Sequence, residues 1–502
     1  MADRSAFTPF DIVSEIWTHL DLPPSALSSL SLPGASELIR PVVPSSFKIG
    51  HLAQSTIALS ALGAAVAHSV RGGSPSDIPR TTVPLRHALL EFQCERLYVL
   101  AGRPPAETWG PIGGLHPTAD GYVRIHDAFP HHRRGALALL GLPETCADRD
   151  AVDERTRMWK SVELETVAVE QKGLAIYALR SFAQWDAQPQ ARALANLPVN
   201  IRRVDVGPSS PRGPKDGLDG PNQRCLSGLR VLEFSRVIVA PVAGKTLAAH
   251  GADVLWVTSP RLPDLPGLDR EFARGKRSIQ LGLDISDDKV KFLKLVRSAD
   301  VVIQGYRPGS LAARGLDAEE LGKVNPGVII ANLSAFGPQG EWRGRRGFDS
   351  LVQTASGINV SEAEHCGGGE VARALPCQAL DHGAGFLLAA GVCAAVYHRE
   401  KDRSEGKNVG AYVVDVSLAG VMKYLRGLGQ YEGRSGFEGD DFTVLGANGE
   451  RIEEEKAFFE TRHTAFGEMT FLRHSASIEG FEPGWDLMPT PLGSGEAVWS
   501  SS

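Results

Sequence analysis

Asp381 is the residue whose type and position best suit chemistry in this chain. It lies in the run 379–391, where an extended stretch gives way to a long helix that contains three glycines. A carboxylate there would meet the positive end of the helix dipole and the free N–H groups of the first turn, while glycines let a ligand approach closely. Two interpretations stay open from this segment alone. Asp381 is a catalytic group, or it is only an N-cap, since aspartate is a preferred capping residue.

Short apolar runs upstream of Asp381 indicate the strands that must position it. They lie at residues 231–234, 254–257, 301–303 and 328–330, with turn residues at their ends and helical patterns between them. This alternation is typical of parallel strands buried under helices, so we predict an α/β fold with an open, Rossmann-like parallel sheet. Ligands of such sheets bind beyond the carboxyl ends of the strands, here residues 235–239, 258–260, 305–307 and 334–337.

Four sequence blocks resemble those of the class III CoA-transferase family, which includes carnitine CoA-transferases, formyl-CoA transferases and 2-methylacyl-CoA racemases. The first block reads LSGLRVLEFSRVIVAP from residue 226 and continues with LAAHGADV from residue 247. The other three read GKRSIQL from 275, ADVVIQGYRPGSL from 299 and GFDSLVQTASG from 347. Each block alone is weak, but the four occur in the family's order and end at the Asp381 segment. The resemblance implies that Asp381 is the nucleophile, in an open-sheet CoA-transferase domain that accompanies a smaller α+β domain.

The same resemblance puts coenzyme A, as an acyl-CoA substrate, in the loops at the strand ends. Its contacts would come from Arg236, Ile238, Val239, Ser259, Leu281, Gly305, Tyr306, Arg307, Ser334 and Phe336. Lys276 and Arg277 are further candidates for the phosphates. The sequence departs from the family at three basic positions, which here hold Ala313 beside Arg314, Asp284 and Ser334.

One position separates transferases from racemases. A racemase needs acid/base groups on both faces of the carbon next to the thioester, and the resemblance puts a histidine at position 348 in racemases. Phe348 cannot carry a proton, which favours a CoA-transferase that moves CoA from an acyl-CoA to a carboxylic acid. In the implied chemistry Asp381 forms a mixed anhydride and then an aspartyl-CoA thioester. Backbone N–H groups of residues 383–385 are candidates for stabilising the oxyanion.

Two other classes of function need consideration. The run Gly244-Lys245-Thr246 resembles the end of a P-loop, but Val239 stands where that motif needs glycine, and no G-x-G-x-x-G follows the first strand. We therefore expect no nucleotide cofactor and interpret Lys245 as a solvated helix residue. A racemase, or a catalytically silent relative that binds acyl-CoA, stays open as an alternative.

The N-terminal part resembles a rearranged first copy of the same family. Residues 64–69 resemble 394–399, and on that register His51 falls on Asp381; residues 120–127 and 134–143 resemble the family's smaller domain. We thus expect a degenerate first copy at 1–205, a linker at 206–225, the large domain at 226–432, and a linker with a C-terminal tail at 433–502. Such a fused form would be either a homodimer or a pseudo-dimeric, interlocked monomer.

Composition narrows the class of protein. The 502 residues are 22% charged with a net charge of −6, which argues against nucleic-acid partners. Six cysteines without paired spacing indicate a reduced compartment and no metal site, and His131 with His132 suggests an exposed helix start. The apolar stretches 57–66 and 386–397 are expected to be buried helices too short for a membrane. We expect an intracellular protein, with the cytoplasm favoured and the mitochondrion left open.

Overall fold

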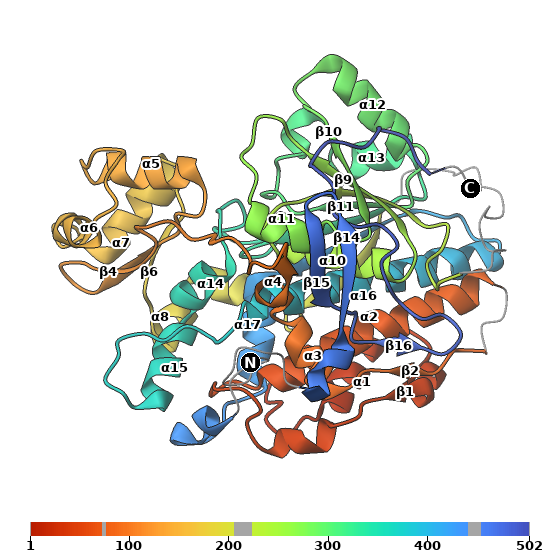
Figure 1. The fold of residues 1–502 in the computed structure, drawn as a ribbon, viewed down its shortest axis with the longest axis horizontal. Coiled ribbons are helices and arrows are strands. Elements are labelled where there is room, and N and C mark those ends of the chain that lie inside the picture. The colour runs from red at the N-terminus through yellow and green to blue at the C-terminus, as the bar shows by residue number, and fades with distance from the viewer. Residues whose placement is uncertain (1, 73–76, 205–222, 440–452, 501–502) are drawn as a thin grey trace.

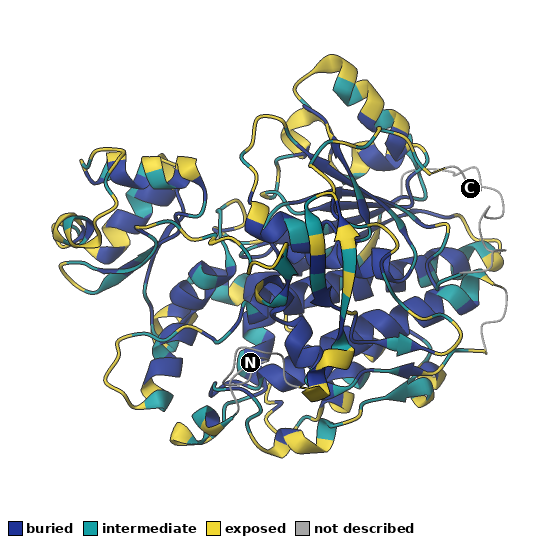
Figure 2. Ribbon diagram, viewed as in Figure 1, coloured by how far each residue is buried: buried dark blue, intermediate teal, exposed yellow. Residues whose placement is uncertain are grey.

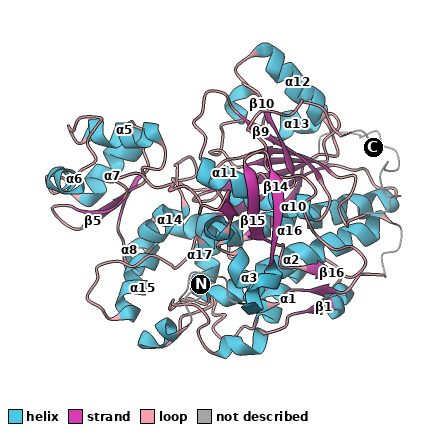
Figure 3. Cartoon of the chain, viewed as in Figure 1, coloured by secondary structure: helices cyan, strands magenta, loops and turns pink. Residues whose placement is uncertain are grey.

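A seven-stranded sheet forms the centre of the large domain in the computed structural model, which describes residues 2–72, 77–204, 223–439 and 453–500 (Figures 1 and 3). The strand order is β10-β9-β8-β11-β12-β13-β7. Its strands are β7 (Val199–Val204), β8 (Arg230–Phe234), β9 (Asp253–Thr258), β10 (Lys276–Gln280), β11 (Val301–Gln304), β12 (Ile329–Ser334) and β13 (Ala411–Ser417). All neighbours are parallel except β7, which runs antiparallel to β13.

The four predicted strands are confirmed as β8, β9, β11 and β12, and so is the α/β class with a large, mostly parallel sheet. Alternate strand residues face two separate cores. Val231 and Ile303 point into a core shared with α10 and α16, whereas Leu232 and Val302 point into a core with Phe292 of α12. Helices therefore cover both faces of the sheet, as expected for buried parallel strands.

The helices that follow β7 along the chain are spread over both faces and the sheet ends. They are α10 (Val239–Ala249), α11 (Pro266–Phe272), α12 (Ser286–Val296), α13 (Ala318–Val324), α14 (Asp349–Ser356), α15 (Ile358–Cys366), α16 (Ala379–Ser404) and α17 (Leu418–Gly427). The expected long helix at Asp381 is α16.

Two long helices, α2 (Ile49–Arg71) and α16, pack against each other inside the protein (Figures 1 and 2). They have 23 and 26 residues, so the expectation that their apolar stretches are too short for a membrane is wrong. Both have the length and composition of a membrane span, yet the most apolar window of each is 100% buried. Core helices pass the same test, and the prediction of buried helices is confirmed.

The two helices begin in the same way. Ile49 N–H donates to Phe47 O at 2.8 Å, and Ala379 N–H donates to Cys377 O at the same distance. The residues before each helix share an unusual backbone conformation, with φ and ψ of −77° and 58° at one and −77° and 61° at the other. An offset of 330 residues relates these positions, and it also pairs His51 with Asp381 and Gly63 with Cys393. Gly63 and Cys393 pack directly against one another.

The N-terminal part contributes a helical layer and a small lobe. The layer contains α1 (Pro9–His19), α3 (Leu85–Glu91) and α4 (Cys94–Leu97) beside α2. The lobe, at the left of Figure 1, has the antiparallel strands β4 (Gly114–Pro117), β5 (Tyr122–Ile125) and β6 (Ile176–Ala178), with helices α5 (Pro130–Leu139), α6 (Arg149–Thr156) and α7 (Ser161–Thr166). It has a hydrophobic core of its own. The short helices α8 (Phe182–Asp186) and α9 (Pro189–Ala193) lead from it to β7.

The C-terminal part packs onto the domain instead of forming only a linker and tail. The strands β14 (Phe459–Thr464) and β15 (Gly467–Leu472) form a hairpin that pairs with β3 (Val99–Leu100), and β2 (Thr81–Thr82) lies between β1 (Leu30–Ser31) and β16 (Ser477–Ile478). Trp485 is 1% exposed. The expected linker at 206–225 lies outside the described residues up to position 222, and the expected linker that begins at 433 does so from position 440 to 452.

Glycines allow α16 to lie close to its neighbours. A Cβ on Gly385 would stand 2.6 Å from Val239 O of α10, and one on Gly391 would stand 2.5 Å from Val414 Cγ1 of β13. Real Cβ atoms are not found this close to other atoms. The glycines of α16 thus serve helix packing.

We predict that Gly391→Val lowers the free energy of unfolding by about 2–3 kcal/mol, because overpacking a close contact costs more than the gain in helix propensity. A matched control is Gly344→Val, at an exposed position where an added Cβ meets nothing within 4 Å. Urea unfolding followed by circular dichroism would measure both. Equal midpoints for the two variants would contradict the packing role of Gly391.

Candidate active site

Asp349 closes the N-terminus of α16. Its Oδ2 accepts hydrogen bonds from the N–H groups of Leu380 at 2.9 Å and Asp381 at 3.0 Å, and its Oδ1 accepts one from the Gln353 amide. Asp381 therefore is not the N-cap. The capping interpretation of Asp381 is wrong, because Asp349 from α14 takes that role with a carboxylate at the positive end of the helix.

Asp381 is a buried carboxyl group with few partners. It is 4% exposed, and its Oδ1 has no hydrogen-bond partner among the described residues. Burial, followed by the nearby charges of Asp349 and Glu95, raises the pKa of Asp381 well above its usual range. Burial also raises the pKa of Asp349 to about 6, against the effect of its hydrogen bonds. The two carboxyl groups interact, so they titrate as a pair.

The first turn of α16 has no N–H group left for an oxyanion. Ala379 donates to Cys377 O and His382 to Gln378 O, while Asp349 accepts from the two residues between them. Residues 383–385 follow this turn, where helical N–H groups bond to carbonyls four residues back. The predicted oxyanion role of residues 383–385 is therefore wrong.

A cavity of about 390 Å³ opens on one side of Asp381, beyond the carboxyl ends of the strands. Eight of the ten residues expected to contact CoA line it: Arg236, Val239, Ser259, Leu281, Gly305, Tyr306, Arg307 and Ser334. The other two do not. Ile238 faces a second cavity, and Phe336, 1% exposed, packs its ring on Trp342 at a centroid distance of 5.0 Å.

Positive charge predominates around this first cavity. Six arginines line it, namely Arg236, Arg261, Arg307, Arg314, Arg345 and Arg346, against Asp284 and Asp381. Asp284 pairs with Arg314 at 2.9 Å and Arg261 at 3.8 Å, while Arg345 pairs with Glu165. Arg307 is exposed and has no ion-pair partner among the described residues. The displaced basic residue Arg314 does reach the cavity.

Two expected phosphate contacts are used elsewhere. Lys276 is 3% exposed and pairs with Glu233 at 2.7 Å, and Arg277 pairs with Asp253 at 2.9 Å. Neither lines the first cavity. Lys245, expected to be solvated, is 1% exposed and pairs with Glu271 at 2.8 Å. Buried charges require such partners, which fixes these residues in the packing of the domain.

The pair His131-His132 is also only partly as predicted. Both residues begin α5, but His132 is buried, while His131 is exposed. Both line the first cavity. Burial lowers the pKa of His132 to about 3, so this ring is neutral at physiological pH.

A second cavity of about 330 Å³ adjoins Asp381 on its other side. Three residues line both cavities: Val237, Phe348 and Asp381. Val237 has φ of 72°, which is an outlier for a β-branched residue and marks local backbone strain. Phe348 stacks on His126 with ring centroids 3.7 Å apart. The carboxyl group of Asp381 thus lies where two compartments meet.

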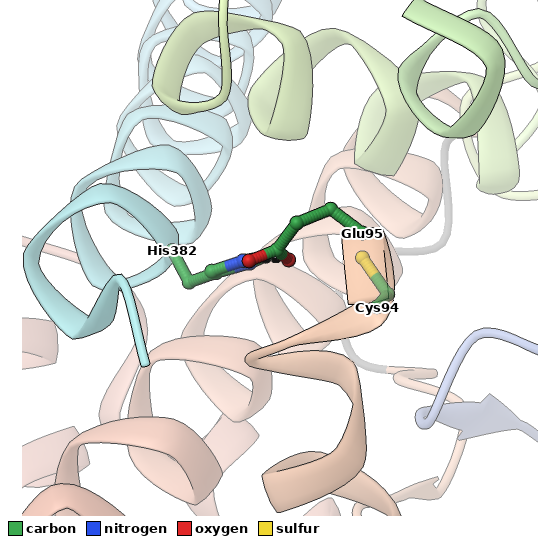
Figure 4. Close-up of side chains that lie close together, drawn as sticks. All are labelled: Cys94, Glu95 and His382. Atoms are coloured by element: carbon green, nitrogen blue, oxygen red, sulfur yellow. Dashed lines mark hydrogen bonds and ion pairs between the residues drawn. The ribbon is translucent and has the colours of Figure 1, made fainter. Parts of the chain in front are cut away.

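Cys94, Glu95 and His382 form a buried cluster behind the helix start (Figure 4). The His382 ring and the Glu95 carboxylate point toward one another, with Nε2 and Oε2 2.9 Å apart. The potential ligand atoms of all three residues lie within 4.8 Å of one another, close enough to hold a metal. However, Lys245 Nζ lies 3.2 Å from Cys94 Sγ. A second cation beside this ammonium group would be repelled, which favours a hydrogen-bonded network.

Sequence reasoning missed the site residues from the N-terminal part. Glu95, Trp109 and His126 line the second cavity, and Phe129 lines the first. They lie more than 250 positions before Asp381. The resemblance of residues 120–127 to the family's smaller domain was the available signal, but it assigned these positions no role.

Comparisons with known proteins agree with the resemblance. Residues 226–436 match the family described as CoA-transferase family III. An acyl-CoA transferase of Gibberella moniliformis is 31% identical over 57% of this chain and 52% of its own length. The acetyl-coenzyme A transferase nodX of Hypoxylon pulicicidum is 26% identical over 82% and 74% of the two chains.

Solved structures are also similar to part of this chain. The crystal structure of a hypothetical protein, Rv3272, from Mycobacterium tuberculosis covers 41% of this chain and 57% of its own at 31% identity, with a TM-score of 0.36. The chain spans about half the length of the first curated relatives that it matches. The family match and the names of the relatives support an enzyme that is similar to the CoA-transferases of family III.

Proposed function

We propose that this protein is an acyl-CoA:carboxylate CoA-transferase whose nucleophile is Asp381. The observation that carries the proposal is the place of this buried carboxyl group between two cavities, one of which is rich in arginine. The arginine-lined cavity suits the phosphates of CoA, because guanidinium groups bind phosphate through several hydrogen bonds. The other cavity is then free for the acyl group and the acceptor acid.

The reaction conserves the energy of the thioester. Asp381 attacks the donor carbonyl, and the C–S bond breaks to give CoA thiolate and an aspartyl anhydride. The thiolate attacks the aspartyl carbonyl of the anhydride, which releases the donor acid and leaves an aspartyl-CoA thioester. An acceptor carboxylate displaces the thiolate again, and the thiolate then attacks the new acyl carbonyl. The product acyl-CoA leaves, and the Asp381 carboxylate is regenerated.

Exclusion of water is essential for this reaction, because hydrolysis of either intermediate would waste the thioester. The low exposure of Asp381, 4%, supports the proposal on this point. The same burial favours the protonated form of Asp381, which is not nucleophilic. Burial of Asp381 therefore lowers the fraction of the reactive carboxylate form, and it also protects the intermediates from water.

Two alternatives to the transferase are a racemase and a catalytically silent binder. A racemase needs proton-transferring groups on both faces of the substrate carbon, and Phe348 occupies one such position. His126 stacks on Phe348, but burial lowers its pKa to about 3, which makes it a weak base. A catalytically silent binder would retain both cavities but form no covalent adduct.

We further propose that the chain is a fused, two-copy form of the family. The matching starts of α2 and α16 support this, as does the single offset of 330 residues that relates them. Contact between Gly63 and its counterpart Cys393 is what a two-fold relation between the helices would produce at its axis. On this proposal the N-terminal copy supplies the small lobe that faces Asp381.

We predict that incubation with a suitable acyl-CoA adds CoA or acyl mass to the wild-type protein, and that hydroxylamine removes it. The adduct should be absent from Asp381→Ala, because the attacking carboxylate is missing. Intact-mass spectrometry with a panel of acyl-CoA thioesters would measure it. Asp287→Ala, an exposed position on α12, is the matched control and should keep the adduct.

Other outcomes separate the alternatives. CoA binding by calorimetry without any adduct would indicate the silent binder. Exchange of the α-proton of a 2-methylacyl-CoA with solvent would indicate a racemase. An adduct that persists in Asp381→Ala would rule out Asp381 as the nucleophile.

We predict that the rate of adduct formation rises with pH, because the carboxylate is the reactive form and its pKa is raised. Asp349→Asn removes a like charge, so the pKa of Asp381 should fall and the midpoint of the pH profile should move down by about one unit or more. The amide oxygen introduced by this substitution can still accept from the helix N–H groups. Stopped-time mass spectrometry across neutral pH would measure the profile, with Asp287→Asn as control. An upward or absent shift would contradict the charge coupling.

A further inference from the structure

We propose that the second cavity selects an uncharged, mostly apolar acyl group, so that the acids served by this enzyme are apolar monocarboxylates and not dicarboxylates. This inference rests on the proposed function and specifies its substrate class. It follows from the charges and side chains that line the cavity on the side of Asp381 away from the arginine-rich one.

Negative charge predominates in the second cavity. Besides the nucleophile, which carries no charge as a thioester, three acids line it: Glu95, Glu107 and Asp349. His126 adds no positive charge, because burial lowers its pKa to about 3. Once the reacting carboxylate of a dicarboxylic acid is placed at Asp381, its second carboxylate would lie among like charges. Such an arrangement is unfavourable and discriminates against the charged substrate.

Arg96 is the one permanent cation among the described residues that line this cavity. Its side chain is 49% exposed, its Nη1 donates to Pro376 O at 3.0 Å, and its Nε lies 3.9 Å from Glu95 Oε1. The guanidinium is therefore already shared between a carbonyl and a carboxylate in a solvated place. Arg96 therefore offers the second carboxylate of a dicarboxylic acid little net attraction.

Apolar side chains form most of the rest of the chamber, and Thr108, Ser350 and Gln378 are its uncharged polar members. Ile238, Leu265 and Leu268 are buried, and Trp109 stands on the solvent side with 46% exposure. Trp109 meets His126 edge to face, at a centroid distance of 5.3 Å. A hydrocarbon or aromatic acyl group that fills about 330 Å³ would gain burial against these side chains.

The test is an acceptor panel with the acyl-CoA donor that forms the adduct. Hexanoate and phenylacetate would be compared with succinate and glutarate, and each acyl-CoA product would be measured by liquid chromatography and mass spectrometry. We expect kcat/KM for the apolar acids to exceed that for the dicarboxylates by at least about ten-fold. Leu268→Trp, which fills the chamber, should lower kcat/KM for phenylacetate at least about ten-fold. Val290→Ala, exposed on α12, is the control.

The outcomes distinguish this inference from the proposed function. If the adduct forms but kcat/KM for the dicarboxylates equals or exceeds that for the apolar acids, the proposed substrate class is wrong and the proposed transferase function still holds. Loss of dicarboxylate transfer in Arg96→Gln alone would also overturn it, because Arg96 would then bind the second carboxylate. An unchanged acceptor profile in Leu268→Trp would show that the acyl group lies elsewhere. No adduct and no transfer to any acceptor would overturn both proposals.

Discussion

The contact between Asp349 and the first turn of α16 determines the character of the site. Asp349 accepts hydrogen bonds from the N–H groups of Leu380 and Asp381, so these groups are not available to other acceptors. Asp381 itself is buried, and its Oδ1 has no donor among the described residues. Two buried carboxyl groups then lie close together: burial raises the pKa values of both, and the charge of Asp349 raises that of Asp381 further. Their contribution to stability is therefore present at low pH and is lost as the pH rises through these folded-state pKa values. A costly arrangement of this kind is typical of functional sites.

The rest of the domain maintains that arrangement through close packing around α16. Gly385 and Gly391 let the helix approach α10 and β13, and Gly63 lets α2 approach from the other side. Because interiors are packed as densely as organic crystals, a helix enclosed on these faces cannot shift to expose its N-terminus. The position of Asp381 relative to the strand ends is thus fixed by backbone packing that lies mostly outside the cavities.

Much of the large domain could be predicted from sequence, because its signals are local. The apolar runs at β8, β9, β11 and β12 and the long helix at Asp381 can each be recognised within a short window. Lys245 and Lys276 were misjudged because their partners, Glu271 and Glu233, lie 26 and 43 positions away, and only the fold brings them together. The alternative interpretation of Asp381 as a cap failed for the same reason, since Asp349 lies 32 positions upstream. Trp109 and His126 could not be found by any local pattern.

The proposed fused arrangement has a consequence for the number of sites. His51 occupies the position of α2 that corresponds to Asp381, and burial lowers its pKa to about 4, so the ring is neutral and cannot act as a carboxylate nucleophile. It lines neither of the two cavities that adjoin Asp381. Among the described residues there is one large parallel sheet, and its carboxyl edge faces Asp381. On the proposed function, such a chain would have one reacting carboxylate, and Glu95, Trp109 and His126 of its N-terminal part line the cavity beside it.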